Sequence, residues 1–198
     1  MSNIVVAIAG KTCSGKTFLL NQLLNSDRFV KLVTSTTRGV RDGETEGQDY
    51  HFIQSALAEY LLDNNRFIEY NVYGNHVYGL TSHELEDKMQ SGKIPCVILT
   101  PNGVDAYKKL LAESYGITVI SIFIDCPQPL LVERLAARTL KESELNVDTL
   151  KIAFDRAISV ALNEQSWRNY LDWDLVVSAG KPNLDQQLIK FINQFSNT

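Results

Sequence analysis

Short runs of consecutive apolar residues alternate along this chain with stretches in which apolar residues recur every three or four positions. The runs predict buried strands at residues 4–9, 29–34, 95–100, 117–124 and 173–177. The helical spacing predicts helices at residues 16–25, 102–113, 129–138 and 183–195, and a longer helix at 148–171. This alternation predicts an α/β fold in which helices cover both faces of a mainly parallel sheet.

The pattern changes after residue 34, where a polar segment rich in glycine, acidic residues, threonine and arginine occupies residues 36–47. Short strands are then expected at 50–53 and 67–73, around a helix at 56–63. We interpret residues 35–91 as a lobe inserted into a single domain, 1–198, whose core is 1–34 and 92–198. A second polar stretch, at 139–146, predicts a mobile flap.

The composition narrows the classes of function. Hydrophobic residues make up 44% of the chain and charged residues 21%, as in an ordinary globular protein. The formal net charge of -4 provides no basic field for a nucleic-acid partner. The first apolar run is too short to cross a membrane, and the three cysteines lack the paired spacing of a disulfide framework or a zinc site. We therefore expect a cytoplasmic protein without nucleic-acid or membrane partners.

A phosphate-binding loop follows the first predicted strand. Residues 10–17 match G-x-x-x-x-G-K-[ST], and a predicted helix comes directly after them. The glycines let backbone N–H groups turn toward phosphates, which the N-terminus of the helix also attracts. In this pattern the lysine reaches the β- and γ-phosphates. The hydroxyl of the last residue, here Thr17, binds Mg²⁺. The loop residues expected to bind ATP are Gly10, Lys11, Thr12, Cys13, Ser14, Gly15, Lys16 and Thr17.

A second group of phosphate-binding side chains is expected within residues 34–52. This segment brings Arg38 and Arg41 close in sequence to several hydroxyls and to Tyr50. Guanidinium groups bind phosphate oxygens through paired hydrogen bonds, and hydroxyls complete the shell. The alternative is a solvated hairpin with ordinary surface charges.

These segments resemble the guanylate kinase family. The family pattern is the phosphate loop, then S-x-T-T-R-x-x-R-x-G-E-x-x-G-x-D-Y-x-F, then F-[IL]-E-[YW] and Y-G. It is matched nearly throughout, in order, at residues 10–17, 35–52, 67–70 and 78–79, with Thr34 where the family frequently has serine. The resemblance implies a three-layer P-loop nucleoside monophosphate kinase fold, with residues 35–91 as the acceptor-binding lobe and a lid over residues 138–156.

The resemblance also implies which residues bind the acceptor nucleotide. Its phosphate is assigned to Arg38 and Arg41 and to Tyr50 and Tyr78. For the two tyrosines, core packing is the alternative. Glu69 is assigned to guanine, because a carboxylate only accepts hydrogen bonds and the guanine edge offers two adjacent donors. The alternative for Glu69 is a solvated strand residue. The residues assigned to GMP are Thr34, Ser35, Arg38, Arg41, Tyr50, Glu69 and Tyr78.

Arginines beyond the inserted lobe match arginines of the family's lid, which closes over the transferring phosphoryl group. Arg134 and Arg138 lie four residues apart, on one face of a predicted helix, and Arg134 is assigned to ATP. A solvated basic face is the alternative for Arg134. The residues with expected catalytic roles are Lys16, Arg38, Arg138 and Arg156.

The chain departs from the family at positions near the acceptor base. Family members usually carry an acidic pair where this chain has Ile98 and Thr100, and a serine or threonine where it has Leu80. These departures predict altered handling of the base and of the metal. Asp125, at the end of the next predicted strand, either substitutes for the acids through water or caps a helix.

We therefore expect Mg²⁺-dependent, in-line transfer of the ATP γ-phosphoryl group to GMP or dGMP by a monomer or homodimer. One alternative is a nucleoside monophosphate kinase with a different or broader (deoxy)nucleotide preference. The other is a guanylate-kinase-like binding module without catalysis. The complete phosphate loop disfavours the binding module, because such modules typically have a damaged loop.

Overall fold

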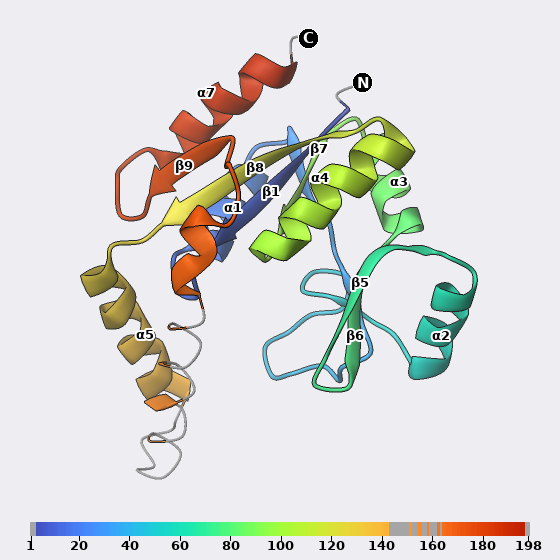
Figure 1. Ribbon diagram of the computed structural model, residues 1–198, viewed down its shortest axis with the longest axis horizontal. Helices are drawn as coiled ribbons and strands as arrows, with labels where there is room; N and C mark the ends of the chain where they lie inside the picture. Colours follow the sequence, from blue (N-terminus) through green and yellow to red (C-terminus); the bar gives the residue numbers. More distant parts are fainter. Residues whose placement is uncertain are drawn as a thin grey trace. The chain divides into compact units, whose positions relative to one another are not determined.

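The computed structural model describes residues 3–142, 151, 154–155, 158, 162 and 164–196 (Figure 1). The chain forms two compact units, each assembled from separate stretches of sequence. Unit 1 comprises Met1–Val6, Leu24–Val97 and Ala106–Val119, and unit 2 comprises Ala7–Leu23, Ile98–Asp105 and Ile120–Thr198. Within the described ranges, no helix is long and apolar enough to span a bilayer.

The larger sheet has five strands in the order β2-β7-β1-β8-β9. They are β1 (Ile4–Gly10), β2 (Phe29–Lys31), β7 (Ile94–Ile98), β8 (Thr118–Asp125) and β9 (Leu175–Ser178). Strand β2 pairs with β7, and β8 with β9, in parallel. Strands of parallel sheets are buried on both faces and read as continuous apolar runs. All five predicted strands are therefore present, although β2 ends before the predicted residue 34.

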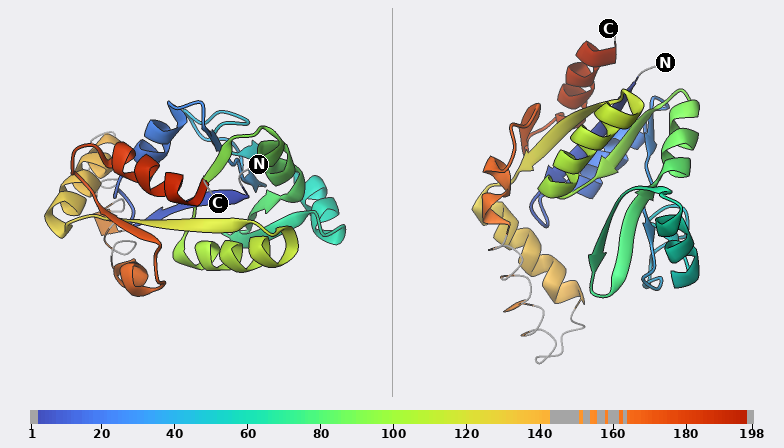
Figure 2. Two further views of the ribbon diagram at one scale, coloured as in Figure 1. Left: turned by 90° about the horizontal axis from the view of Figure 1, so that it is seen from above. Right: turned by 45° about the vertical axis from the view of Figure 1, so that its right-hand side comes forward.

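The four shorter predicted helices are confirmed. They are α1 (Lys16–Leu24), α4 (Pro101–Tyr115), α5 (Gln128–Glu142) and α7 (Leu184–Ser196). Seen from above, α1 and α7 lie on one side of β8 (Figure 2). Each presents an apolar stripe to the interior: Leu20 and Leu23 of α1 and Leu188 of α7 are fully or almost fully buried.

Two predictions after residue 138 are partly wrong. The flap was predicted to start at residue 139, but α5 continues to Glu142 and Thr139 is buried. Lysine and glutamate in this stretch are good helix formers despite their polarity. Residues 143–146 lie outside the described residues.

The long helix predicted at 148–171 ends in a different geometry. Residues 151, 154, 155, 158 and 162 are helical, and the rest of 148–163 lies outside the described residues. Glu164 lies in a turn, and Gln165–Asn169 forms a 3₁₀-helix, η1, instead of an α-helix. Glu164 accepts hydrogen bonds from Thr12, so a tertiary contact replaces the helical continuation that apolar spacing predicted.

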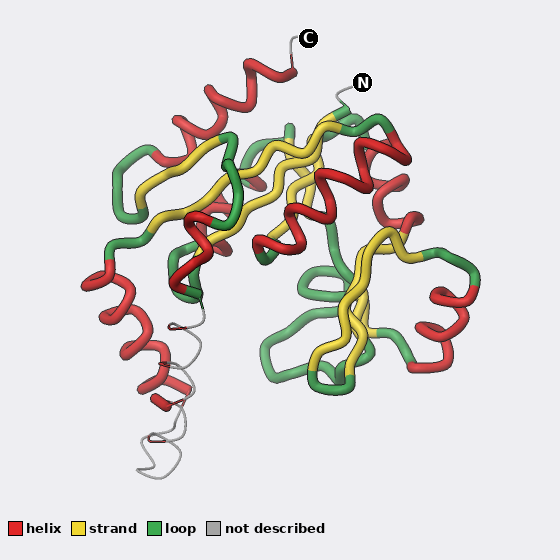
Figure 3. Tube along the Cα trace, in the orientation of Figure 1, coloured by secondary structure: helices red, strands yellow, loops and turns green. Residues whose placement is uncertain are grey.

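Unit 1 contains a second sheet, with the strand order β4-β3-β6-β5. Its strands are β3 (Ser35–Thr36), β4 (His51–Phe52), β5 (Phe67–Tyr73) and β6 (His76–Thr81). Strands β5 and β6 form an antiparallel hairpin, visible as two adjacent yellow segments in Figure 3. Helix α2 (Ser55–Asp63) follows β4. The elements predicted at 50–53, 56–63 and 67–73 are therefore confirmed.

The hydrophobic pattern did not predict β6 or the helix α3 (Ser82–Gln90) that follows it. Helix α3 has few apolar residues, so its periodicity is weak. Its start nevertheless carries a readable signal: the Thr81 hydroxyl accepts a hydrogen bond from the backbone N–H of Glu84 at 3.2 Å. Threonine followed three residues later by glutamate is the capping-box pattern, which marks a helix N-terminus.

Gly79 fixes the close approach of β6 to β5. A Cβ atom at this position would lie 2.5 Å from the Glu69 backbone oxygen and 2.8 Å from the Phe67 ring. Gly79→Ala should lower the free energy of unfolding by about 1–3 kcal/mol, the usual cost of overpacking. Gly39→Ala is the matched control, because nothing lies within 4 Å of its added Cβ. Urea unfolding of both variants tests this, and equal stabilities would contradict it.

Candidate active site

The phosphate loop of unit 2 joins β1 to α1. Gly10 has φ +153, and a Cβ there would lie 2.8 Å from the Ile124 backbone oxygen. The first position of the loop therefore accommodates only glycine. The Ser14 N–H donates to the Lys11 carbonyl at 3.0 Å, which closes the turn. The Ser14 hydroxyl is buried and has no hydrogen-bond partner among the described residues.

Lys16 holds its ammonium group against the loop itself. Its Nζ donates to the carbonyl oxygens of Gly10 at 2.7 Å and Lys11 at 2.9 Å. Burial lowers the pKa of Lys16, and the negative charge of Glu164 partly offsets this effect. These contacts hold the amine near the start of α1, where the helix N-terminus also favours phosphates.

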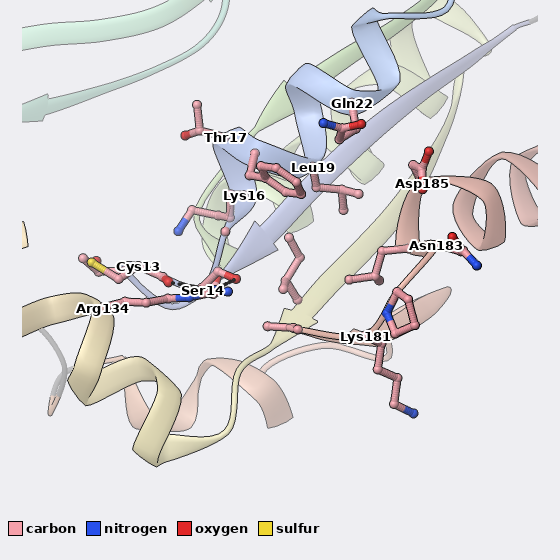
Figure 4. A pocket seen from close by; sticks show the side chains of 18 of the residues that line it. Cys13, Ser14, Lys16, Thr17, Leu19, Gln22, Arg134, Lys181, Asn183 and Asp185 are labelled. Atoms are coloured by element: carbon pink, nitrogen blue, oxygen red, sulfur yellow. Dashed lines mark hydrogen bonds between the residues drawn. The ribbon is translucent and has the colours of Figure 1, made fainter. Parts of the chain in front are cut away.

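A cavity of about 860 Å³ opens beside this loop. Its lining includes loop residues 12–17, two arginines of α5 and residues 179–185 before and at the start of α7. Figure 4 shows Arg134 lying alongside Cys13 and Ser14. Its Nη1 donates to the Ser14 carbonyl at 3.1 Å, so Arg134 contacts the loop instead of forming a merely solvated face. Arg138 lines the same cavity, while Arg156 lies outside the described residues.

The oxygen donors of this cavity suit a magnesium–nucleotide complex. The Thr17 side chain is exposed and lines the cavity. Within the described ranges, no three histidine, cysteine, aspartate or glutamate residues gather into a metal-binding group. Mg²⁺ commonly keeps several waters and binds through one or two protein oxygens together with substrate phosphates, so one hydroxyl fits this mode. Asp125 is half-buried, and its carbonyl oxygen accepts a 2.7 Å hydrogen bond from Ala179 N–H.

Arg38 is the most tightly held of the predicted phosphate ligands in unit 1. Only 9% of it is exposed, and its two terminal nitrogens donate to both Glu44 carboxylate oxygens at 2.9 and 2.8 Å. The guanidinium lies 5.4 Å from the centre of the Tyr50 ring, within cation–π range. The hydrogen bonds with Glu44 are the main cause of the raised Arg38 pKa, with a further contribution from Tyr78.

Glu44 joins the two predicted arginines. The same carboxylate that binds Arg38 also accepts the backbone N–H of Arg41 at 2.9 Å, and these hydrogen bonds lower the pKa of Glu44. The Arg41 side chain is exposed. Glu44 is not among the predicted site residues, although it occupies the G-E position of the family pattern and could have been found there.

The remaining predicted acceptor residues lie on β3 and β6 or directly before β3 and β4. Tyr50 and Tyr78 are both half-buried, with ring centres 5.9 Å apart in an edge-on arrangement. Partial exposure argues against simple core packing for either ring. Ser35 is buried on β3 opposite Gly79, and the half-buried Thr34 accepts the His51 N–H through its carbonyl oxygen.

Glu69 lies on β5 at an irregular register position and is half-buried. Burial raises the pKa of Glu69, and a hydrogen bond from the Asn71 amide partly opposes this shift. The Tyr107 hydroxyl, which interacts electrostatically with Glu69, is buried and has no hydrogen-bond partner among the described residues. The half-buried carboxylate therefore differs from an ordinary solvated strand residue.

The positions that depart from the family serve the fold in this chain. Leu80 is completely buried. The Thr100 hydroxyl accepts the Gly103 N–H at 3.2 Å and so caps the start of α4. Ile98 is half-buried at the end of β7. None of the three side chains contributes a carboxylate.

A phosphate loop with its lysine held in place, together with a clustered arginine–tyrosine site on a separate unit, defines a P-loop nucleoside monophosphate kinase. A family model for guanylate kinase matches residues 2–185. The chain belongs to the guanylate kinase family.

Individual relatives agree with this assignment. Guanylate kinase of Anaplasma phagocytophilum (strain HZ) is 32% identical over 152 residues, covering 75% of this chain and 70% of that protein. Guanylate kinase of Blochmanniella pennsylvanica (strain BPEN) is 28% identical, covering 89% and 79%. The crystal structure of guanylate kinase from Anaplasma phagocytophilum covers 98% of this chain and 87% of its own, with a TM-score of 0.63 at 22% identity, a likeness of fold.

Proposed function

We propose that this protein transfers the γ-phosphoryl group of ATP to GMP or dGMP, giving ADP and the nucleoside diphosphate. The observation that carries the proposal is the acceptor cluster: Arg38, held by Glu44 and packed against Tyr50, is accompanied in the same unit by the half-buried carboxylate of Glu69. A phosphate and a guanine base need these two kinds of group. Membership of the guanylate kinase family supports the same reaction.

The donor half would hold ATP at the phosphate loop. We assign the phosphates to Lys16 and the loop N–H groups, and Arg134 and Arg138 line the same cavity. Arg156 is assigned to the same phosphoryl group from its match to the family. In the reaction, the bond from the γ-phosphorus to its bridging oxygen breaks as a bond forms to a phosphate oxygen of GMP. That oxygen is already anionic near neutral pH, so the protein needs no general base.

The bound metal would supply charge neutralisation at the β- and γ-phosphates. The Thr17 hydroxyl is the protein oxygen we assign to Mg²⁺, because it is exposed and lines the cavity beside Lys16. The free thiols of Cys13, Cys96 and Cys126 support a reducing, cytoplasmic setting.

Guanine would be recognised by Glu69. Its two carboxylate oxygens can accept from guanine N1–H and the 2-amino group, whereas adenine presents no such pair of donors. A wrong base would leave the half-buried carboxylate without its partners, which costs binding energy. The departures from the family favour a second candidate, a kinase with a broader acceptor preference. Leu80 is buried and has no hydroxyl, and the Thr100 hydroxyl accepts a hydrogen bond at the start of α4.

A screen of acceptors tests the proposal. With Mg²⁺-ATP as donor, we expect turnover of GMP and dGMP, with kcat/KM exceeding that of AMP by up to about 10⁴-fold, as for sites built to pair a substrate N–H. CMP and dTMP complete the comparison, measured by ADP release. Equal use of AMP and GMP would reject guanine recognition, and use of several monophosphates would favour the broader kinase.

Lys16→Ala should separate an active kinase from a binding module. Loss of the ammonium removes the positive charge that we assign to the transferring group, so kcat should fall by about 10²–10³-fold or more. Circular dichroism and thermal unfolding of the variant check that the fold survives. Undiminished turnover in a folded variant would remove Lys16 from the mechanism.

The affinity for GMP should depend on pH through Glu69. Because its pKa is raised, Glu69 takes up a proton at a higher pH than an ordinary glutamate does. The protonated carboxyl no longer accepts two hydrogen bonds, so KM for GMP should rise as the pH falls through this raised pKa, with KM for ATP much less affected. Glu69→Gln should have a high KM for GMP at every pH. A variant that keeps the wild-type pH profile would contradict this assignment.

A further inference from the structure

Glu164 binds the phosphate loop from a distant part of unit 2. Its Oε2 accepts the backbone N–H of Thr12 at 2.5 Å, and its Oε1 accepts the Thr12 hydroxyl at 2.7 Å. The two residues are 152 positions apart in sequence. Both oxygens of one carboxylate are thus used on a single residue of the loop.

The burial of Glu164 makes these contacts more than a surface interaction. Only 6% of the residue is exposed. A carboxylate removed from water carries a large desolvation cost unless hydrogen bonds and opposite charge compensate it. Thr12 supplies the hydrogen bonds, and Lys16 supplies a positive charge that interacts with Glu164.

The charges around Lys16 come from three parts of unit 2. Glu164 and Cys13 favour the protonated amine, whereas Arg138 of α5 and burial disfavour it. Glu164 is the largest of the favourable influences. Without the charge of Glu164, the Arg138 guanidinium and burial would lower the pKa of Lys16 further.

We propose that Glu164 is a positioning residue of the donor site, which holds the phosphate loop in its nucleotide-binding conformation by clamping Thr12 on two sides. It touches neither the transferred group nor the acceptor. Its effect on ATP passes through the loop backbone and through the charge of Lys16. This inference rests on the proposed function only in taking ATP as the donor.

The experiment is direct titration of the full chain with Mg²⁺-ATP by calorimetry, without acceptor, from neutral to alkaline pH. Glu164→Ala should weaken ATP binding by about 10- to 100-fold, the range for losing hydrogen bonds to a charged group. Glu164→Gln keeps an oxygen for one Thr12 hydrogen bond, so its loss at neutral pH should be smaller. As the pH rises, the ATP affinity of this variant should begin to decline at a lower pH than in the wild type. The reason is that Lys16 loses its proton more readily, and the phosphates then lose the charge of its ammonium group.

Asp172→Asn is the matched control, since it removes one negative charge from an exposed position in the same part of the chain. It should bind ATP as the wild type does at every pH. Circular dichroism identifies any variant that fails to fold. If Glu164→Ala does not fold, Glu164→Gln decides the question through its alkaline decline, which a purely structural contact would not move.

The proposal is overturned if a folded Glu164→Gln variant keeps the wild-type alkaline decline, or if folded Glu164→Ala binds ATP with wild-type affinity. Neither result depends on the acceptor. A mistaken assignment of GMP would instead appear in the acceptor screen, with ATP binding and its dependence on Glu164 intact.

Discussion

The need to hold a positive charge inside a tight loop governs the donor half of this protein. The Lys16 ammonium donates to two loop carbonyls, and those contacts require the sharp curl that begins at Gly10. The curl in turn requires β1 and α1 to meet at this point, since the first supplies Gly10 and the second begins at Lys16. Arg134 and Glu164 then hold the loop from two other segments, one at Ser14 and one at Thr12. Contacts from α1, α5 and Glu164 thus fix the shape of the loop.

Unit 1 also holds a charged side chain in place, with a carboxylate as the partner of the cation. Arg38 is nearly buried, and the Glu44 carboxylate keeps it paired and oriented. The rings of Tyr50 and Phe52 limit the orientations that the guanidinium can take, because it packs near both of them. Glu69 contrasts with Glu44: burial raises its pKa, and its hydrogen bond comes from an amide, not a cation. The Glu44 carboxylate is therefore paired with a guanidinium, whereas the half-buried Glu69 carboxylate is bonded to a neutral amide.

Much of the fold could be predicted, and the exceptions have identifiable causes. Strands buried on both faces, such as β1, appear in the sequence as apolar runs, and α1 and α7 appear through their apolar spacing. Helix α3 was missed because its surface is mostly polar. The 3₁₀-helix after Glu164 was predicted as α-helix because spacing does not report tertiary hydrogen bonds. In the candidate site, the motifs alone were enough to predict roles for Lys16, Arg38 and Glu69. They gave no indication of Glu164, whose partner Thr12 is remote in sequence.

Residue type and spacing alone predict the chemistry of this protein: a complete phosphate loop, an arginine–tyrosine segment expected to bind a second phosphate, and a carboxylate expected to bind guanine. These features are local, so residue type and spacing are enough to reveal them. The partners and the burial of these groups became visible only in the folded chain. Arg38 is paired with Glu44, Thr100 caps the start of α4, Leu80 is buried, and Glu164 contacts the phosphate loop. Such pairings depend on which segments meet in space and on how much water they exclude, and neither property is written in the spacing of residues.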